Sequence, residues 1–412
     1  MSFNLKVGAV TGALIALIAF QNVNPAYAGH SRPAPAIVSP FNVKDFGAKG
    51  DGVTDDTNAI QNAANTAFSN HRGVFFPPGN YLHANFITFN GVAVTGSGAA
   101  SVLLAVDPNN TTVVLTGSNP SMQNMVISTA GLGLATPTPN TATLSVQNAN
   151  SFTVANDTIV QGLDRVGIWV TNSSVGLVNA CACDGTGNPA DTGIVVGQSH
   201  NISVTGNQLQ NEGTGIYVDP ALPASQSIAL LSNGIGNVTY PTRAYGIEAE
   251  GVSSLDIANN AIQIIDSSTG FAIWARNSDS FNISNNDTWG GLIGIRAEAS
   301  GPSGNVVNQN TIHNCGLQAI ALPNIATSAV QVTGNQFGEC GLQGSGPSVN
   351  YAVIIIYGDP ASGATTFVQN NSYQGHTNGL QSKVTCTFTA PHIPAANVTG
   401  NTQTQTVLMD HI

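Results

Sequence analysis

The sequence predicts an all-β fold, a single-stranded parallel β-helix (a solenoid) with about 25 residues per coil. Three observations support this. Only 8% of the 412 residues are charged and 45 are glycine, a composition typical of many short strands joined by tight turns. An asparagine recurs at a nearly fixed spacing. A small residue followed by an apolar one recurs between successive asparagines, as in VGIWV, TGIYV and FAIWA.

The recurring asparagines each follow a short run of alternating apolar residues, as in FTVAN, LDIANN and VQVTGN, which is typical of half-buried strands. With Cys181 at the one position that lacks an asparagine, the intervals are 24 to 27 residues. Asparagines stacked on neighbouring coils can hydrogen-bond one another and the turn backbone, and they tolerate left-handed φ. An antiparallel sandwich, the alternative, would not keep this spacing. The asparagines are Asn156, Asn207, Asn233, Asn260, Asn286, Asn310 and Asn335.

The first residues have the pattern of a secretory signal peptide. Lys6 is basic, Val7–Phe20 is apolar but too short to span a membrane, and a small-x-small site ends at Ala28. We therefore expect cleavage after Ala28, a secreted or periplasmic protein, and no membrane span. The expected divisions are 1–28 signal peptide, 29–40 linker, 41–105 N-terminal cap and first coils, and 106–412 parallel β-helix.

The charge and the cysteines exclude several classes of partner. A formal net charge of −11 with ten Lys and Arg lacks the basic footprint that nucleic-acid binding needs. Five cysteines leave at least one thiol free, and without a CxxC pair or a nearby His cluster we expect no zinc and no other cofactor. Cys315 and Cys340 share a repeat position about 4.8 Å apart, which fits either a disulfide or a plain stack. The oligomeric state stays open, with a trimer among the alternatives.

A different segment precedes the repeats. It contains DFGAKGDGVTDDT over Asp45–Thr57, apolar residues at helical spacing over Asp55–Phe68, and FPPGNY from Phe76. A helix here would cap the open end of the first coil. We read Asp45, Asp51, Asp55 and Asp56 as turn and cap residues.

These phrases resemble the N-terminal motif of the pectate lyase-like superfamily, and with the repeats the resemblance covers roughly residues 41 to 400. It implies a right-handed parallel β-helix that acts on or binds a polysaccharide. It does not imply a reaction, because the superfamily includes polygalacturonases, pectate lyases, exo-glucanases, alginate epimerases and phage tailspikes. The polygalacturonase signatures NTD, GHG and RIK are missing, and the one DD pair lies in the cap.

Alignment of the strands that begin with the small residue predicts which side chains point outward. Four adjacent strands, from Tyr217 to Glu298, then present six charged and two aromatic residues at eight outward positions. The outward residues of the strands on either side are uncharged, so the charged stripe is limited to these four strands. The outward pairs are Trp169 and Thr171, Val195 and Gly197, Tyr217 and Asp219, Glu248 and Glu250, Trp274 and Arg276, Arg296 and Glu298, and Ala321 and Pro323.

Carboxylates stacked about 5 to 10 Å apart have the separation that glycosidases use, and crowding favours the protonated form of one of them. We expect Glu248 or Glu250 to be the general acid and Asp219 the base or nucleophile. Register predicts that Asp219 neighbours Glu250, and that Arg276 lies between Glu250 and Glu298. Six outward side chains are expected to bind substrate through aromatic faces and charged groups: Trp169, Tyr217, Trp274, Arg276, Arg296 and Glu298.

Three further candidates lie on or just before such strands: Asp164, Asp191 and Arg243. Polygalacturonases, one family within the superfamily that the chain resembles, carry catalytic Asp residues just before such strands. Three functions compete. The first is a glycoside hydrolase. The second is a lyase or epimerase acting on uronates, with calcium on Asp219, Glu248 and Glu250 if it is a lyase. The third is a non-catalytic glycan-binding or tailspike-like β-helix, in which the stripe is a salt-bridge ladder that fixes register.

Overall fold

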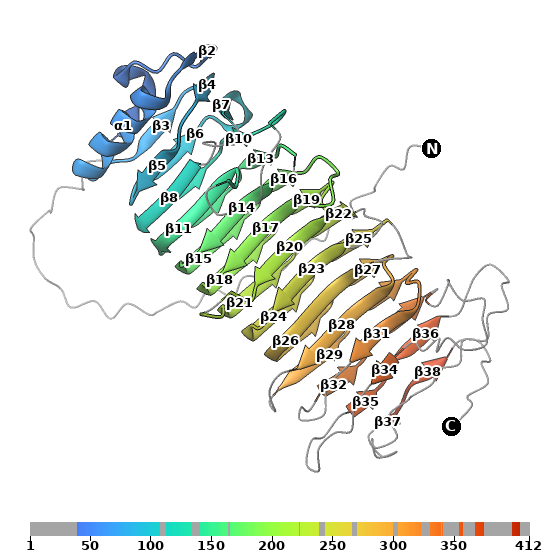
Figure 1. The fold of residues 1–412 in the computed structure, drawn as a ribbon. Coiled ribbons are helices and arrows are strands. Elements are labelled where there is room, and N and C mark those ends of the chain that lie inside the picture. The colour runs from blue at the N-terminus through green and yellow to red at the C-terminus, as the bar shows by residue number, and fades with distance from the viewer. Residues whose placement is uncertain are drawn as a thin grey trace, which may run out of the picture. The chain divides into compact units, whose positions relative to one another are not determined.

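From Ser39 onward the chain winds into a parallel β-solenoid of about ten turns with about 26 residues per turn, so the predicted fold is confirmed (Figure 1). The structure is a computed structural model. The expected signal peptide and residues 29–38 of the linker lie outside the residues it describes, as does the C-terminal Ile412. The described residues are 39–107, 113–132, 141–163, 165–221, 223–238, 244–265, 270–299, 304–322, 330–338, 340, 354–356, 367–374 and 398–403.

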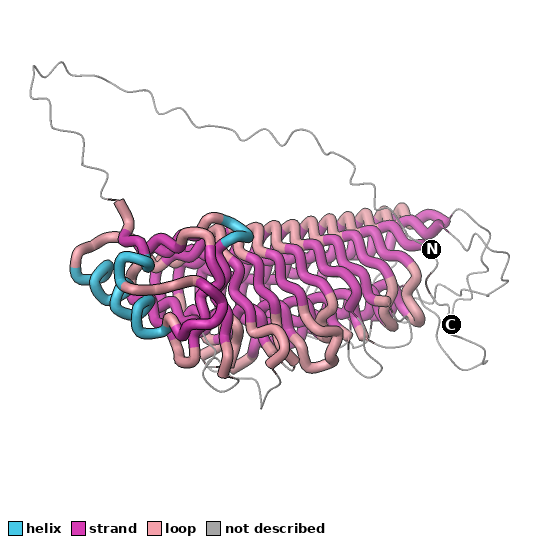
Figure 2. Tube along the Cα trace, turned by 90° about the horizontal axis from the view of Figure 1, so that it is seen from above, coloured by secondary structure: helices cyan, strands magenta, loops and turns pink. Residues whose placement is uncertain are grey.

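Most coils contribute a strand to each of three faces, and the pairings between described strands of neighbouring coils are parallel. Figure 2 shows the coils stacked side by side, with the helical segment at one end. The first face, which carries the strands that begin with a small residue, comprises β5 (Ile87–Asn90), β8 (Val113–Ser118), β11 (Leu144–Asn150), β14 (Val166–Thr171), β17 (Thr192–Gly197), β20 (Thr214–Asp219), β23 (Tyr245–Glu250), the start of β26 (Phe271–Ser284), β28 (Ile293–Ala299), β31 (Gln318–Leu322) and β34 (Ile354–Ile356).

The second face follows the first after a short bend and is continuous with it in the 24-stranded sheet. The long strand β26 turns from one face to the other. The second face comprises β1 (Phe41–Asn42), β3 (Val74–Phe76), β6 (Ala93–Gly96), β9 (Ser121–Gln123), β12 (Thr153–Ala155), β15 (Ser174–Asn179), β18 (His200–Thr205), β21 (Gln226–Leu231), β24 (Ser253–Ala258), the end of β26, β29 (Asn305–Asn308), β32 (Val330–Thr333), β35 (Phe367–Gln369) and β37 (Val398–Thr399).

The third face is a separate 14-stranded sheet that closes each coil. It comprises β2 (Asp51–Asp55), β4 (Gly79–His83), β7 (Ser101–Ala105), β10 (Val126–Ser128), β13 (Thr158–Val160), β16 (Ala182–Asp184), β19 (Gln208–Gln210), β22 (Gly234–Val238), β25 (Ala261–Ile264), β27 (Asp287–Trp289), β30 (Thr311–His313), β33 (Gln336–Gly338), β36 (Ser372–Gln374) and β38 (Thr402–Gln403).

The core explains the small residue near the start of most first-face strands. The isoleucine after it, such as Ile216 or Ile247, is fully buried as predicted. The small residue points inward as well: a Cβ on Gly246 would lie 2.3 Å from Cγ2 of Ile262, on the third face of the same coil. The two faces meet so closely here that only glycine fits without a shift of Ile262, while the coils of Ala272 and Ala319 have room for a methyl group.

The predicted asparagine ladder is present. Asn233 shows its pattern: its backbone N–H and its Nδ2 both donate to Oδ1 of Asn260 on the next coil, and its Nδ2 also donates to the carbonyl of Val204. The bonds connect fully or nearly buried amides, so the ladder satisfies turn backbone that the core would otherwise leave unpaired. It runs through Asn207, Asn233, Asn260, Asn286, Asn310, Asn335, Asn371 and Asn401.

For one member of the ladder, Asn156, the prediction was wrong by one residue. Pairing of β13 with β16 places Asp157, and not Asn156, beside Cys181 at the ladder position. The Asp157 carboxylate accepts the backbone N–H of Met125 at 2.9 Å, as a ladder amide would. Asn156 instead has φ 56°, so the left-handed turn and the ladder use two successive positions.

The cap is built as predicted. Helix α1 (Thr57–Ser69) buries its apolar face, including Ile60, Ala63 and Ala67, on the first coil. The carboxylates of Asp51, Asp55 and Asp56 accept nearby backbone N–H groups, which is the structural role expected of them. Two short 3-10 helices, Val43–Phe46 and Gly98–Ala100, flank this region.

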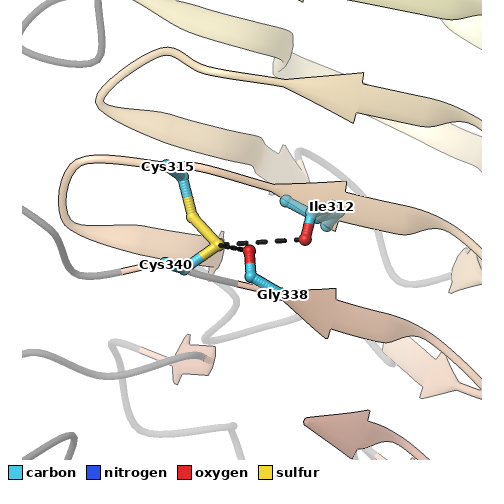
Figure 3. The surroundings of a disulfide bond; sticks show 4 residues. All are labelled: Ile312, Cys315, Gly338 and Cys340. Carbon is cyan, nitrogen blue, oxygen red and sulfur yellow. Dashed lines mark hydrogen bonds between the residues drawn. A yellow bond between two sulfur atoms is a disulfide. The ribbon is translucent and has the colours of Figure 1, made fainter. Parts of the chain in front are cut away.

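Cys315 and Cys340 form a disulfide, which decides between the two alternatives left open by the sequence. Figure 3 shows the bridge joining the segments that follow β30 and β33, so it ties two neighbouring coils together. Cys181 and Cys183 are free and buried, and Cys386 lies outside the described residues. Among the residues described, none of the helices has the length and hydropathy needed to span a membrane.

Candidate functional site

The outer surface of the first face carries the predicted stripe, and the register of its strands is now explicit. Strand pairing places one residue of each outward pair in a single row across the coils. The region of the first face from β14 to β28 is called the candidate face below. Its row consists of Trp169, Val195, Tyr217, Glu248, Trp274 and Arg296, and it ends at the small Ala321.

Tyr217 lies at the centre of the charged groups. The pKa of its phenol is raised to about 12, first by burial and then by the negative charges of Asp219, Glu248 and Glu250, with Arg276 acting in the opposite direction. Four charged side chains from three neighbouring strands therefore act on one hydroxyl. At neutral pH this phenol keeps its proton, and it can donate a hydrogen bond to a substrate or a carboxylate.

The predicted contact between Glu250 and Arg276 is present. Nη1 of Arg276 lies 3.2 Å from Oε2 of Glu250, and the two residues are paired in register. Asp219 is paired with Gly197 on its other side, so no side chain covers it from that coil. Its Oδ1 accepts the backbone N–H of Ala221, which fixes the carboxylate at the end of β20.

The predicted contact between Arg276 and Glu298 was wrong. The register of β26 against β28 shifts between Ala275 and Ser278, and this irregularity carries Glu298 toward the row of Trp274 and Arg296. Oε1 of Glu298 accepts Nε1–H of Trp274 at 3.1 Å and Nε–H of Arg296 at 2.8 Å. Its side chain is only 9% exposed, so Glu298 orients the indole and the guanidinium and offers little surface of its own to a ligand.

A second outward column was missed by sequence reasoning. Tyr245 and Phe271, the residues just before the small residue on their strands, pack at ring distances of 5.4 Å and 5.2 Å from Trp274. Arg276 and Arg296 lie 5.2 Å and 5.3 Å from the centroid of the same indole, in cation–π contact. The alternation rule hid this column, because the small residue points inward together with the isoleucine that follows it. An aromatic directly before the small residue was the available signal.

The N-terminal end of the candidate face is apolar. Val195 and Val166 are nearly buried outside the main core, and Trp169 and Tyr217 pack against them. The face thus changes along the solenoid from an apolar end, through the carboxylates around Tyr217, to an aromatic and cationic end at Trp274. All the predicted site residues that the structure describes lie on this face, with the exception of Asp191.

Asp191 lies beneath the face and is fully buried. Its carboxylate accepts N–H groups of Arg165, Thr186 and Asn188 and the hydroxyl of Thr186, so its position is that of a turn-forming residue. We do not carry it into the proposed site. Asp164 and Arg243 lie outside the described residues.

The same corner holds a buried carboxylate that the sequence did not reveal. Glu212 is fully buried, and its Oε1 accepts Nε2–H of Gln161 at 2.6 Å. Burial, and to a lesser degree the charge of Asp191, raises the pKa of Glu212 well above its usual range. A group this deep does not reach a polymer on the surface.

In the part of the chain that the structure describes, no three His, Cys, Asp or Glu side chains are arranged to hold a metal ion. Asp219, Glu248 and Glu250, the carboxylates expected to bind calcium in a lyase, are therefore not arranged as a metal site. The chemistry available on the candidate face itself is proton transfer between carboxylates, binding of flat rings by the aromatics, and binding of anionic or hydroxyl groups by the two arginines.

Two family profiles match the chain. The profile described as "Rhamnogalacturonase A/epimerase, pectate lyase-like" matches residues 40–219, and the profile "Right handed beta helix region" matches residues 193–373. The resemblance to the pectate lyase-like β-helices is confirmed. The overlap of the two matches, residues 193–219, contains Tyr217 and Asp219 of the candidate face, and the second match contains the rest of its charged residues.

Similar curated proteins match the chain only over a short segment. "Alginate lyase 7" of Azotobacter vinelandii is 60% identical over 42 residues, and "Mannuronan C5-epimerase AlgE5" of the same organism is 57% identical over 42 residues. Each match covers 10% of this chain and only 5% or 4% of the relative.

Solved structures share the fold at low sequence identity. The catalytic domain of Agl-KA has a TM-score of 0.59 at 18% identity, over 92% of this chain and 70% of that one. PfbA, a surface adhesin of Streptococcus pneumoniae, has a TM-score of 0.57 at 16% identity, over 82% and 90%. Because one of these is a catalytic domain and the other an adhesin, the fold does not separate catalysis from binding.

Proposed function

We propose that this protein is an extracellular polysaccharide-processing enzyme, and that it hydrolyses a glycosidic bond on the candidate face. The carrying observation is the group of carboxylates around Tyr217, flanked by an apolar aromatic end and a cationic aromatic end. A polymer laid across the strands would meet aromatic rings on both sides of the acidic centre. The pectate lyase-like resemblance supports the substrate class.

The register favours a particular pair of carboxylates. Glu248 is paired with Tyr217, and Asp219 lies two residues further along the strand of Tyr217. A strand spacing of about 4.8 Å and a rise of about 3.3 Å per residue put the two backbones about 8 Å apart. Inverting glycosidases hold their carboxyl groups about 6.5 to 9.5 Å apart, with room for a water between them.

Roles follow from the neighbours of each group. Glu250 is ion-paired with Arg276, which suits it to position substrate. Glu248, between Tyr217 and Trp274 in the row, is the proposed general acid, and Asp219 is the proposed base that activates water. Trp274 and Tyr217 hold sugar rings against the sheet, and Arg296 and Trp169 extend the binding surface in either direction.

The test is a panel of polysaccharides incubated with the mature protein, with products identified by mass. Hydrolysis gives products that contain one added water, with inversion at the anomeric carbon. Glu248→Gln and Asp219→Asn are each expected to lose about 10²–10⁴-fold in rate. The matched control is Asp256→Asn on the second face. Unchanged rates in both site variants would refute the assignment.

A lyase or epimerase acting on uronates is the second candidate. It is favoured by Arg276 and Arg296 around Trp274, which could hold a sugar carboxylate, and by the names of the curated relatives. A lyase gives an unsaturated sugar without added water, and an epimerase changes composition without shortening the polymer. Loss of activity with a chelator would show that the reaction needs a divalent cation. Retention of a glycan without any product would instead indicate a binding protein.

A further inference from the structure

The third face carries an exposed tryptophan that takes no part in the candidate face. Trp289 ends β27 and is 45% exposed, whereas Trp169 and Trp274, the other two tryptophans of the chain, are half-buried. Its large apolar ring is left largely in water, and so is the side chain of Ile265, which follows β25 and is 55% exposed. Tryptophan is enriched at binding surfaces, because its ring is apolar while its N–H can donate a hydrogen bond.

The indole is held in place by its neighbours. Register places Gln263, Trp289 and His313 side by side on β25, β27 and β30. The ring centroids of Trp289 and His313 are 4.8 Å apart with the planes 32° from parallel. Nε2 of His313 lies 3.8 Å from Oδ1 of Asp287, which shares the outward side of β27 with Trp289.

The surface is low on one side of this group. Beyond His313 the row continues to Gly338, which is buried beneath the imidazole, whereas β22 on the other side carries Gly236, whose Cβ position has no atom within 4 Å. The exposed indole therefore has open sheet toward β22, with an amide, an imidazole and a carboxylate around it. These rim groups offer both donors and acceptors.

We propose that Trp289, with Gln263, Asp287 and His313, forms a second glycan-binding site that takes a hexose unit of a neutral polysaccharide. The apolar face of a pyranose packs on an indole while its hydroxyls reach the polar rim. Asp287 and the net charge of −11 disfavour a uronate here. A protein partner is disfavoured by size, because a stable interface buries about 800 Å² on each side around an apolar core.

This site goes beyond the proposed function, because binding on the third face does not require cleavage on the first. With this site, one protein molecule would bind polysaccharide at two places, one on the first face and one on the third. Such a site would keep the protein on an insoluble or crowded glycan between encounters of the candidate face with a chain end or backbone.

Affinity electrophoresis tests the proposal with the full mature chain in gels that contain xylan, mannan, hydroxyethyl cellulose or polygalacturonate. The wild type is expected to be retarded by at least one of the three neutral polymers. Trp289→Ala should raise the apparent Kd for that polymer at least tenfold, and His313→Ala should raise it two- to fivefold. Phe86→Ala, which removes an exposed aromatic from the cap, is the matched control and should leave it unchanged.

Several results would overturn the site. One is equal retardation of Trp289→Ala and wild type in every gel, and another is retardation by polygalacturonate alone. A shift of Trp289→Ala from dimer to monomer in size-exclusion chromatography would reassign the surface to a second copy of the chain. Glu248→Gln should stay retarded, so failure here is separate from failure of the hydrolase, which is read from products. Circular dichroism checks the fold, and His313→Ala carries the test if Trp289→Ala does not fold.

Discussion

Replacement of Asp157 by asparagine is expected to stabilise the protein, and to do so only above acidic pH. Asp157 is 1% exposed and occupies the ladder position that asparagine fills in later coils. Its Oδ1 accepts the N–H of Met125, and no described residue bonds its buried Oδ2. Burial raises the pKa of this carboxyl from its ordinary value of 3.8 to about 7, against the effect of the N–H groups of Met125 and Ala155.

The sign of the effect follows from the two pKa values. Between pH 3.8 and about 7 the folded state holds a proton that the unfolded state has lost, so the free energy of unfolding falls as pH rises. The contribution of protonated Asp157 to the free energy of unfolding is fully present below pH 3.8 and fully lost above about pH 7. A shift of about three pKa units corresponds to about 4 kcal/mol. An asparagine does not titrate, and its Nδ2 can donate to the preceding coil as Asn233 does to Val204.

The assay compares thermal unfolding of wild type and Asp157→Asn between pH 4 and pH 8. The difference in Tm should be small at pH 4 and should grow to about 5 °C at pH 8 in a chain of this length, for which unfolding entropy scales with residue number. Glu212 also has a raised pKa, but it is present in both proteins, so its effect cancels in the difference in Tm. Asp45→Asn, at an exposed carboxylate, is the control. A difference in Tm that does not change with pH, or a less stable Asp157→Asn at pH 8, would refute the reasoning.

Two further expectations concern the coils themselves. The disulfide closes a separation of 25 residues, so the double substitution Cys315→Ala and Cys340→Ala should lower the free energy of unfolding by about 3 kcal/mol, measured by denaturant unfolding, with earlier proteolysis after β30. Gly246→Ala should lower the free energy of unfolding by about 1–3 kcal/mol, because its Cβ would meet Ile262 at 2.3 Å. Gly236→Ala, with open space at its Cβ, should leave the stability nearly unchanged. Equal melting temperatures of the two variants would contradict the inward position of the small residue.

The repeat made most of the fold predictable, because stacking coils impose the same demand at each repeat position. Ile216 and Ile247 had to be inward, and Asn233 and Asn260 had to lie side by side. The one-residue error at Asn156 has a physical cause. Two successive positions favour asparagine, one for left-handed φ and the next for the ladder, and a coil such as Asn259-Asn260 fills both. A coil with asparagine at only the first position is ambiguous from sequence alone.

The site was less predictable, because outward side chains depend on corners and bulges that alternation does not describe. The corner before Gly246 turned Tyr245 outward, and the irregularity in β26 moved Glu298 from Arg276 to Trp274. In both places the inward–outward alternation of side chains is interrupted by one residue. A side chain near the interruption therefore points in a direction, or contacts a neighbour, that strict alternation did not predict.

These displacements change which charged residues need a functional explanation. Glu298 is accounted for by the hydrogen bonds that orient Trp274 and Arg296, and Glu250 by its ion pair with Arg276. A salt-bridge ladder that fixes register thus explains part of the stripe.

The ladder explanation does not extend to the centre of the face. Three carboxylates near one phenol are not a favourable arrangement for folding, because like charges close together repel one another. Ser145 and Ala321, at the two ends of the outward row, show that the row accepts small neutral residues. The fold therefore does not require charge at every position of the row, which leaves Asp219 and Glu248 as candidates for a functional role.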